Sequence, residues 1–288
     1  MTALFSYWSA PEVDSVNFSG WASPSDRDAG WMLSTLLARK TFEKLRFIGD
    51  PVGCDMVTRL KLPFDSVETF DSSIDGMPST LWSTGKLVAL RQSLPWLRDG
   101  ETTVHLDHDV FLLNGFPEEW FEGRSAIFQS AEHFDKGFGF YSPVINAFVS
   151  LAHSGQILLP SSFNNGCGLA FNCGVIGLRP EAAAYVERWC DEALFLCAQM
   201  SRHNEWISKI PLCWPVIPEQ FVAAAVAHEM GIEPAWIMED SRAPDGYVHL
   251  IGRSKRAPDA TLRIHNRLAR DFPAAATLHR SLHSSSPL

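Results

Sequence analysis

Residues 101–117, with the sequence E-T-T-V-H-L-D-H-D-V-F-L-L-N-G-F-P, place two carboxylates in an otherwise apolar setting. A short apolar run ends at Leu106, is interrupted by Asp107-His108-Asp109 and resumes at Val110. Residues two apart leave an extended backbone on the same side, so Asp107 and Asp109 can aim at one point. Carboxylates are costly to bury without a partner, and their oxygens suit a hard divalent cation such as Mn2+ or Mg2+. The pattern therefore predicts a strand that ends at a metal site, where the cation would in turn hold phosphates.

A second D-x-D stretch shows that the spacing alone decides little. Asp26-Arg27-Asp28 follows Ser23-Pro24-Ser25 with no strand before it, which predicts a loop or helix-cap feature. Asp107 and Asp109 also have an ordinary structural interpretation, a strand-to-loop turn with solvated carboxylates, which stays open until the rest of the chain is considered. By strand alternation, His105 and His108 should point away from the two carboxylates.

The composition excludes several classes of protein. With 288 residues, 46% hydrophobic and 20% charged, the chain is globular and long enough for one large α/β domain or two small ones. The net charge of −9 argues against nonspecific nucleic-acid binding. The six cysteines show no zinc-type spacing, and neither a signal peptide nor a membrane span is apparent, so we expect a protein of the reducing cytoplasm.

The first part of the chain alternates between strand and helix patterns, which is typical of an α/β fold with a mostly parallel central sheet. A single catalytic domain is expected over residues 1–275, followed by a disordered tail at 276–288. The expected strands lie at 2–8, 44–48, 62–67, 104–106, 126–130 and 232–238, and the expected helices at 31–44, 52–60, 81–90, 182–200 and 219–228.

Four further residues stand out, each with an ordinary structural alternative. Lys86 lies on an expected helix, where a solvated lysine is the simpler interpretation. Asn172 interrupts the apolar run F-N-N-G-C-G-L-A-F-N-C-G-V-I-G-L at 163–178 and needs a hydrogen-bond partner. Glu219 opens a helix, where an acidic residue commonly complements the helix dipole. His249 ends an apolar strand, where a satisfied core histidine is more usual than a metal ligand.

Taken together and in order, these pieces resemble a GT-A fold glycosyltransferase, and in particular glycosyltransferase family 8, the glycogenin and galactosyltransferase group. The resemblance consists of an apolar strand into D-x-D, then F-N-C-G-V-I-G, an acidic-Gln pair opening a helix, and H-L-I-G-R-S-K. It spans residues 104–255 and implies a GT-A-like, Rossmann-type fold. The implied reaction moves a hexose from a nucleotide sugar, expected to be UDP-linked, to an acceptor hydroxyl of a glycan, lipid or protein.

The resemblance implies a role for each matching residue near the diphosphate. Asp107, Asp109 and His249 would bind Mn2+ (or Mg2+), which bridges the two phosphates of the donor. Lys255 would contact the diphosphate and stabilise the charge on the leaving group. Gly252 would let the backbone approach the phosphate.

Four more residues acquire roles around the sugar. Asn172 would hydrogen-bond the donor sugar, and Lys86 matches a basic residue that contacts the donor in some members. Gln220, with its neighbour Glu219, would lie near the anomeric carbon or the acceptor. The family implies retention of the anomeric configuration, and since no residue is a secure covalent nucleophile, a front-face route is favoured.

Three departures from the family pattern bear on substrate choice. Glu219 replaces the usual Asp, Leu250 replaces an aromatic residue, and Arg256-Ala257-Pro258 follows Lys255 in place of Pro-Trp. Three other interpretations stay open: a nucleotide-sugar-binding protein with weak or no catalysis, a sugar nucleotidyltransferase, and a metal-dependent phosphohydrolase. Residues 7–11, Y-W-S-A-P, lack the glycine-rich phosphate loop expected of a nucleotidyltransferase, and a phosphohydrolase would need more His/Asp clusters.

Overall fold

The protein divides into two compact units, which are described separately. The computed structural model describes residues 1–13, 20–165, 167–202, 215–239 and 242–284. Unit 1 consists of Met1–Thr69, Leu106–Pro117 and Ala243–Leu288, and unit 2 of Phe70–His105 and Glu118–Arg242. Two compact units can belong to one domain, so the single catalytic domain over residues 1–275 stays a prediction.

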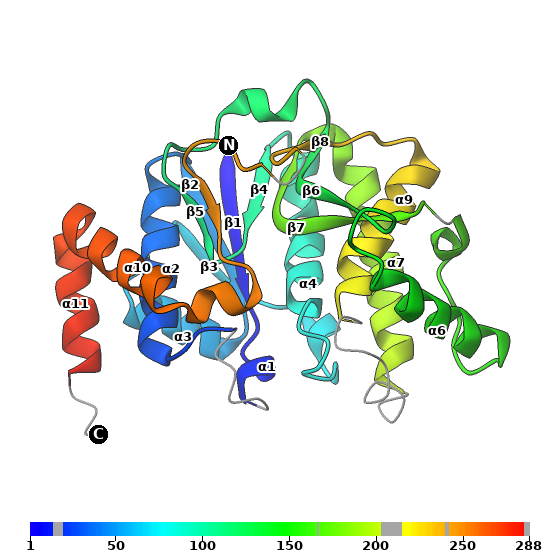
Figure 1. Cartoon of the computed structure of the whole chain (residues 1–288), viewed down its shortest axis with the longest axis horizontal. Helices are drawn as coiled ribbons and strands as arrows, with labels where there is room; N and C mark the ends of the chain where they lie inside the picture. Colours follow the sequence, from blue (N-terminus) through cyan, green and yellow to red (C-terminus); the bar gives the residue numbers. More distant parts are fainter. Residues whose placement is uncertain (14–19, 166, 203–214, 240–241, 285–288) are drawn as a thin grey trace. The chain divides into compact units, whose positions relative to one another are not determined.

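Three parallel strands form the sheet of unit 1, in the order β3-β2-β1 (Figure 1). They are β1 (Thr2–Tyr7), β2 (Lys44–Gly49) and β3 (Ser66–Thr69). β1 is almost wholly buried, whereas β2 exposes Lys44 at its start and is buried from Phe47 to Gly49. β3 begins four residues later than predicted: Pro63 has no N–H to donate to a sheet, and the Phe64 N–H donates locally to the Leu62 carbonyl at 2.9 Å.

Helices α1 (Ala10–Val13), α2 (Pro24–Arg39) and α3 (Pro51–Arg59) complete this part of unit 1. Helix α2 begins seven residues before the predicted start, because the Ser23 hydroxyl accepts the Asp26 N–H and Pro24 occupies the first turn. The second D-x-D stretch therefore lies in the first turns of α2, close to its expected role as a helix-cap feature.

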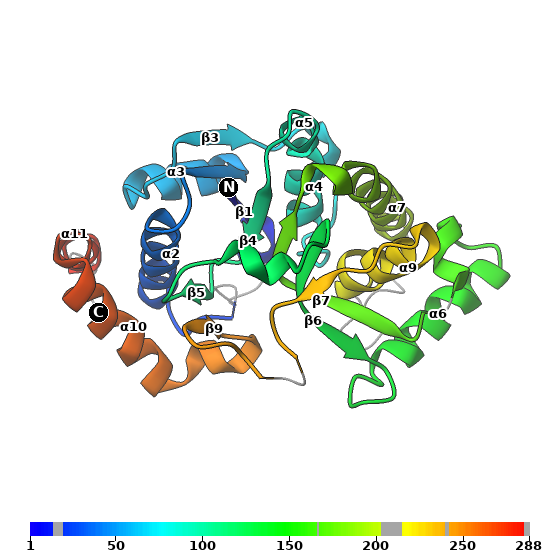
Figure 2. The same ribbon diagram turned by 90° about the horizontal axis from the view of Figure 1, so that it is seen from above.

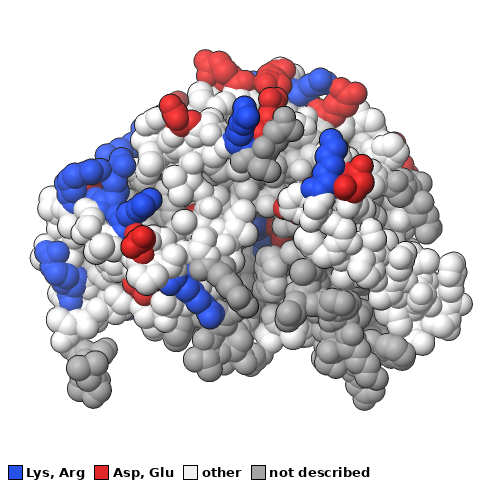
Figure 3. Space-filling view, in the orientation of Figure 1, with Lys and Arg blue, Asp and Glu red and all other residues white. Residues whose placement is uncertain are grey.

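The C-terminal part of unit 1 supplies a second, smaller sheet and a helical pair. β5 (Val110–Leu112) pairs antiparallel with β9 (Tyr247–His249), and η6 (Gly252–Arg256) follows. Helices α10 (Pro258–Asp271) and α11 (Pro273–His283) pack along α2 (Figure 2). Lys and Arg side chains gather over the edge where α10 and α11 lie (Figure 3).

Helix α11 includes residues 276–283, which were expected to be a disordered tail. The helix is held because Ala276 and His279 are buried and His279 contacts the start of α2. Disorder therefore does not begin at residue 276. Residues 285–288 lie outside the described residues.

Unit 2 holds four strands in the order β4-β7-β6-β8. They are β4 (Thr103–Leu106), β6 (Ala126–His133), β7 (Leu169–Leu178) and β8 (Ala235–Trp236). β6 pairs antiparallel with β7, with a register shift between Phe128 and Ser130, and parallel with β8. Three of the four pairings described in the main strands of both units are parallel, so the predicted α/β class with a mostly parallel sheet is confirmed.

The helices of unit 2 bury a large aromatic core. Trp189 and Phe221 are fully buried, and Phe128 packs edge-on against Trp189. Helices α7 and α9 lie side by side (Figure 2). The longer helices are α4 (Thr84–Gln92), α5 (Leu94–Arg98), α6 (Tyr141–His153), α7 (Ala183–Ser201) and α9 (Val222–Met230). The short 3-10 turns are η1 (Ser72–Ile74), η2 (Glu118–Phe121), η3 (Ser161–Asn165) and η4 (Pro180–Ala182), and η5 (Ile217–Phe221) is one turn of π-helix.

Among the described residues, no helix combines the length and the apolar character needed to cross a membrane. Cys173, Cys190 and Cys197 are buried free thiols, as expected for small hydrophobic residues. Cys213 lies outside the described residues. The cytoplasmic location stays a prediction.

Candidate active site

The turn between β4 and β5 brings together the three predicted metal ligands. One side-chain donor atom from each of Asp107, Asp109 and His249 lies within 4.8 Å of the other two. The register explains the grouping: Val110 of β5 pairs with His249 of β9, and the Leu250 N–H donates to the Asp109 carbonyl at 3.1 Å. Residues separated by 140 positions in sequence are thus held together by a two-stranded sheet.

Lys255 approaches the same carboxylate from η6. Its Nζ lies 2.5 Å from Asp109 Oδ2, and His249 Nε2 lies 3.3 Å from Asp109 Oδ1. Asp109 is only 4% exposed. Burial alone would raise the pKa of this carboxyl, but Lys255 and His249 outweigh burial and hold the pKa well below its usual range. Asp109 is therefore a buried, ionised carboxylate surrounded by positive or donor groups.

These residues fit a divalent cation. Two carboxylates and an imidazole are ligands that Mn2+ accepts, and Mg2+ accepts the carboxylates. The ammonium of Lys255 already occupies the neighbourhood of Asp109, which shows that the fold stabilises positive charge there. Gly252, on the same turn as Lys255, has φ +56, and a Cβ at this position would meet no heavy atom within 4 Å. The space beside the Gly252 backbone is therefore open, and the approach of a phosphate to it stays a prediction.

In unit 2, Lys86 is not a solvated helix lysine. Its Nζ lies 2.6 Å from Glu219 Oε1 and donates to the Cys173 carbonyl at 2.9 Å. Glu219 is fully buried, and its backbone carbonyl accepts the Trp189 indole N–H at 3.0 Å. The pair joins α4 to the π-helical turn η5, a local irregularity that is frequent at functional sites.

The remaining predicted residues of unit 2 belong to one hydrogen-bonded group. Asn172 Nδ2 donates to Glu132 Oε1 at 2.8 Å, while Asn172 Oδ1 accepts the Gly174 N–H at 3.1 Å. The Tyr141 hydroxyl lies 2.5 Å from Glu132 Oε2 and also contacts Gln220 Oε1. Asn172 and Gln220 are thereby connected through Glu132 and Tyr141.

Glu132 and Tyr141 were missed by the sequence analysis. The predicted strand ended at residue 130, whereas β6 continues to His133 and so carries Glu132 into the group. Tyr141 lies in the stretch F-D-K-G-F-G-F-Y-S, and it begins α6. The signal that could have found Glu132 is a charged residue two positions after Ser130, the end of the predicted strand. Nothing in the sequence distinguishes Tyr141 from its aromatic neighbours.

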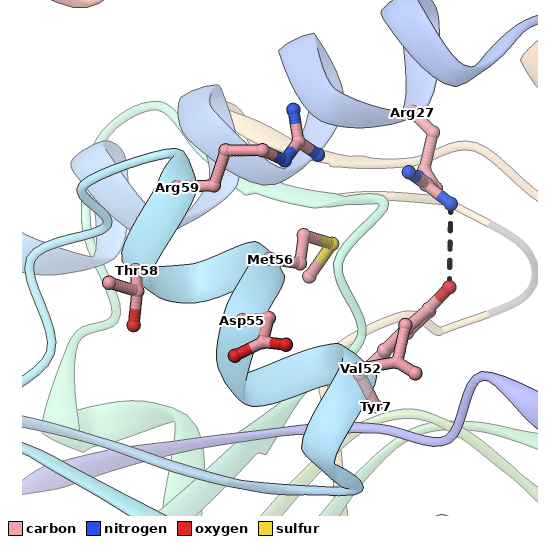
Figure 4. A pocket seen from close by; sticks show the side chains of 7 residues that line it. All are labelled: Tyr7, Arg27, Val52, Asp55, Met56, Thr58 and Arg59. Carbon is pink, nitrogen blue, oxygen red and sulfur yellow. Dashed lines mark hydrogen bonds between the residues drawn. The ribbon is translucent and has the colours of Figure 1, made fainter.

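The described cavity of unit 1 contains none of the predicted site residues. It has a volume of about 470 Å³ and is lined by Tyr7, Arg27, Val52, Asp55, Met56, Thr58 and Arg59 (Figure 4). Both of its arginines form ion pairs with the buried Asp28. The Arg27 guanidinium lies 3.0 Å from Asp28 Oδ1, and the Arg59 guanidinium lies 2.8 Å from Asp28 Oδ2. The charge of both arginines is therefore neutralised by Asp28, with the Arg59 pair joining α3 to α2, and the cavity is no ready anion site.

A family model matches residues 1–278, almost the whole chain. The chain belongs to the family of unknown function DUF6734. The family assigns no reaction to the two groups of residues described above, and comparison with curated proteins returns no significant match.

Several solved structures are similar to this member of DUF6734. One is the galactosyltransferase LgtC in complex with donor and acceptor sugar analogs, at 12% identity and a TM-score of 0.44, over 100% of this chain and 98% of that one. An active-site mutant of LgtC matches at 12% identity and a TM-score of 0.44, over 94% and 96% of the two chains. Core-mannan synthase A from Aspergillus fumigatus in its Mn/GDP form matches at 10% identity and a TM-score of 0.32, over 68% and 65%.

Proposed function

We propose that this protein is a metal-dependent glycosyltransferase that moves a hexose from a UDP-sugar to an acceptor hydroxyl with retention of configuration. The observation that carries the proposal is the grouping of Asp107, Asp109 and His249, with Lys255 on the same carboxylate. The resemblance of the sequence motifs to those of glycosyltransferase family 8 supports the same proposed activity.

In this proposal unit 1 binds the diphosphate end of the donor. Asp107, Asp109 and His249 hold Mn2+ or Mg2+, which neutralises the charge of the diphosphate when it is bound. Lys255 leaves Asp109 for a phosphate oxygen and stabilises the negative charge that develops on the departing UDP. The open backbone at Gly252 admits that phosphate.

The roles proposed for the residues of unit 2 rest on the resemblance to glycosyltransferase family 8. Asn172 binds a sugar hydroxyl, with its side chain fixed by Glu132 and the Gly174 N–H. Tyr141 orients the Gln220 amide, which lies near the anomeric carbon or the acceptor oxygen. Lys86 neutralises the buried Glu219, so that η5 presents Gln220 from a fixed backbone.

The unit 2 carboxylates favour a front-face route over a covalent intermediate. Glu219 is committed to Lys86, and Glu132 accepts hydrogen bonds from Asn172 and Tyr141. A carboxylate held in this way is a weaker nucleophile than a free one, and a double displacement needs a carboxylate at the anomeric carbon. A front-face route uses the leaving diphosphate and its charge stabilisation by Lys255 instead.

The proposal is tested by incubating the protein with UDP-glucose or UDP-galactose and measuring UDP release with Mn2+ and with EDTA. We expect release with Mn2+ in the wild type and loss of release in Asp109→Asn. Asp99→Asn, at the exposed end of α5, is the matched control and should behave as the wild type. Product configuration is then read from the anomeric NMR signal at the first turnovers.

A catalytically silent nucleotide-sugar binder is the second candidate. It is favoured by the buried Lys86–Glu219 ion pair. This pair keeps Glu219, which stands at the acidic position of the glycosyltransferase family 8 motif, away from solvent. Manganese-dependent UDP binding without UDP release from any UDP-hexose, in the presence of a panel of sugar acceptors, would support the binder and contradict the transferase.

A further inference from the structure

Trp21 contacts both Lys255 and the turn Asp107-His108-Asp109, which is called the metal-binding turn below after its proposed role. Its indole N–H donates to His108 Nε2 at 3.1 Å, and Lys255 Nζ lies 6.0 Å from the centre of its ring. The indole is only 1% exposed. One side chain therefore lies against two elements that are far apart in the sequence, and sequence analysis gave it no role.

His108, the middle residue of Asp107-His108-Asp109, is held on two sides. Its ring stacks on Trp31 with centroids 5.0 Å apart and planes inclined by 7°, while Trp21 reaches its Nε2 atom. A hydrogen bond received at Nε2 places the proton of the neutral imidazole on Nδ1. A middle residue fixed in this way limits the rotation of the turn, and so limits where the two flanking carboxylates can point.

The backbone before Trp21 is fitted to the Lys255 side chain. Gly20 has φ +88, and a Cβ at this position would lie 3.3 Å from Lys255 Cδ. The Gly20 carbonyl accepts the Arg256 Nε–H at 3.2 Å. On the other side, Gly30 of α2 makes room for the indole, since a Cβ there would lie 2.6 Å from Trp21. Glycine at both positions allows Trp21 to lie between α2, the metal-binding turn and η6.

We propose that Trp21 is a positioning residue that couples the metal-binding turn to Lys255 through His108. The inference rests on the proposed metal site. The indole holds the turn in place, so that the two carboxylates keep their positions when a cation binds, and it supports the stem of Lys255 when the ammonium leaves Asp109. Outer partners of metal ligands commonly change metal affinity by about ten- to a hundredfold.

The test is calorimetric titration of Mn2+ alone into the full chain. Trp21→Phe keeps a ring but removes the N–H, and we expect about tenfold weaker binding. His108→Phe removes the acceptor and should weaken binding to a similar extent. If Trp21 acts through His108, the double variant binds only about tenfold more weakly, where independent effects would multiply to about a hundredfold. Trp236→Phe, the same substitution on β8 in unit 2, is the control and should bind as the wild type.

The outcomes separate the two proposals. Wild-type binding of Mn2+ together with unchanged binding in Trp21→Phe, or with multiplying effects in the double variant, overturns the positioning role alone. Failure of the wild type to bind Mn2+ overturns both the metal site and the role of Trp21.

A measurement on the wild type decides the matter if Trp21→Phe does not fold. In proton–nitrogen NMR spectra, addition of diamagnetic Mg2+ should shift the Trp21 indole N–H signal and leave that of Trp236 in place. An unshifted Trp21 signal at saturating Mg2+ would overturn the inference.

Discussion

Lys255 Nζ lies 2.5 Å from Asp109 Oδ2, so an ammonium group already neutralises a carboxylate that is proposed to bind a divalent cation. The two side chains are 11% and 5% exposed, and the attraction between them is weakly screened. A cation bound at Asp109 would therefore compete with Lys255, whose ammonium becomes available for a phosphate oxygen once it leaves the carboxylate.

Lys255→Met should change two affinities in opposite directions. Mn2+ alone should bind about tenfold more tightly because the competing ammonium is gone, and UDP in saturating Mn2+ should bind more weakly. Titration calorimetry measures both. Lys61→Met, at an exposed lysine of unit 1, is the control, and unchanged affinities in Lys255→Met would show that the pair has no such function.

Breaking the buried Lys86–Glu219 pair should destabilise the protein. Lys86→Met leaves the fully buried Glu219 without its cation, which costs about 3–5 kcal/mol of unfolding free energy. Lys86→Met/Glu219→Gln should recover part of that loss. Urea unfolding measures both variants against Arg98→Met, which removes an exposed pair with Glu187 and should cost at most about 1 kcal/mol. Equal losses in Lys86→Met and Arg98→Met would refute the account of this pair.

Substitution of two buried tyrosines should distinguish an effect on catalysis from an effect on stability. Tyr141→Phe and Tyr185→Phe each remove one hydroxyl that makes hydrogen bonds, and each should cost about 1 kcal/mol of stability. Only Tyr141 contacts Gln220, so only Tyr141→Phe should lower the rate of UDP release, by roughly tenfold or more. A parallel loss of rate in Tyr185→Phe would mean that the effect is structural.

The stability that helix α11 contributes through His279 should fall as the pH drops below neutrality. His279 is buried against the Ser25 carbonyl at 2.9 Å. Burial lowers the pKa of its imidazole, and the nearby His283 and His265 act in the same direction against the Ser25 carbonyl and Asp28. The unfolded chain then binds more protons than the folded one between the lowered pKa and about pH 6.5, so stability falls as the pH drops through this window.

His279→Gln keeps a donor near the Nε2 position but cannot titrate. We expect this variant to lose less stability than the wild type between pH 7.5 and pH 5.5 in urea unfolding. His133→Gln, at a half-buried histidine of unit 2, serves as the control. A wild-type loss that His279→Gln reproduces in full would assign the acid sensitivity to other groups.

The proximity of Asp107, Asp109 and His249 could be predicted from the sequence because their spacing is local or carried by a motif, and their binding of a metal stays a prediction. Asp107 and Asp109 flank one residue at a strand end, and H-L-I-G-R-S-K contains His249, Gly252 and Lys255 within seven residues. Strand alternation predicted that His108 points away from the carboxylates, but residues 107–109 form a turn between β4 and β5, in which the His108 ring contacts Trp21 and Trp31.

Contacts between distant segments were not readable from the sequence. Lys86 appeared solvated because helix periodicity cannot reveal that the other end of its side chain meets Glu219, 133 positions later. Tyr141 and Trp21 depend in the same way on partners brought together only by the fold. The start of α2 was missed for a local reason, since a cap at Ser23 and Pro24 outweighs the apolar pattern that begins at Trp31.

The most direct test of the central claim is calorimetric titration of UDP into the wild type and Asp109→Ala, with and without Mn2+. We expect tight binding only in the wild type with Mn2+, and loss of that gain in Asp109→Ala. Equal UDP affinity with and without Mn2+, or a variant that binds as well as the wild type, would contradict a metal-bridged donor site at Asp107, Asp109 and His249.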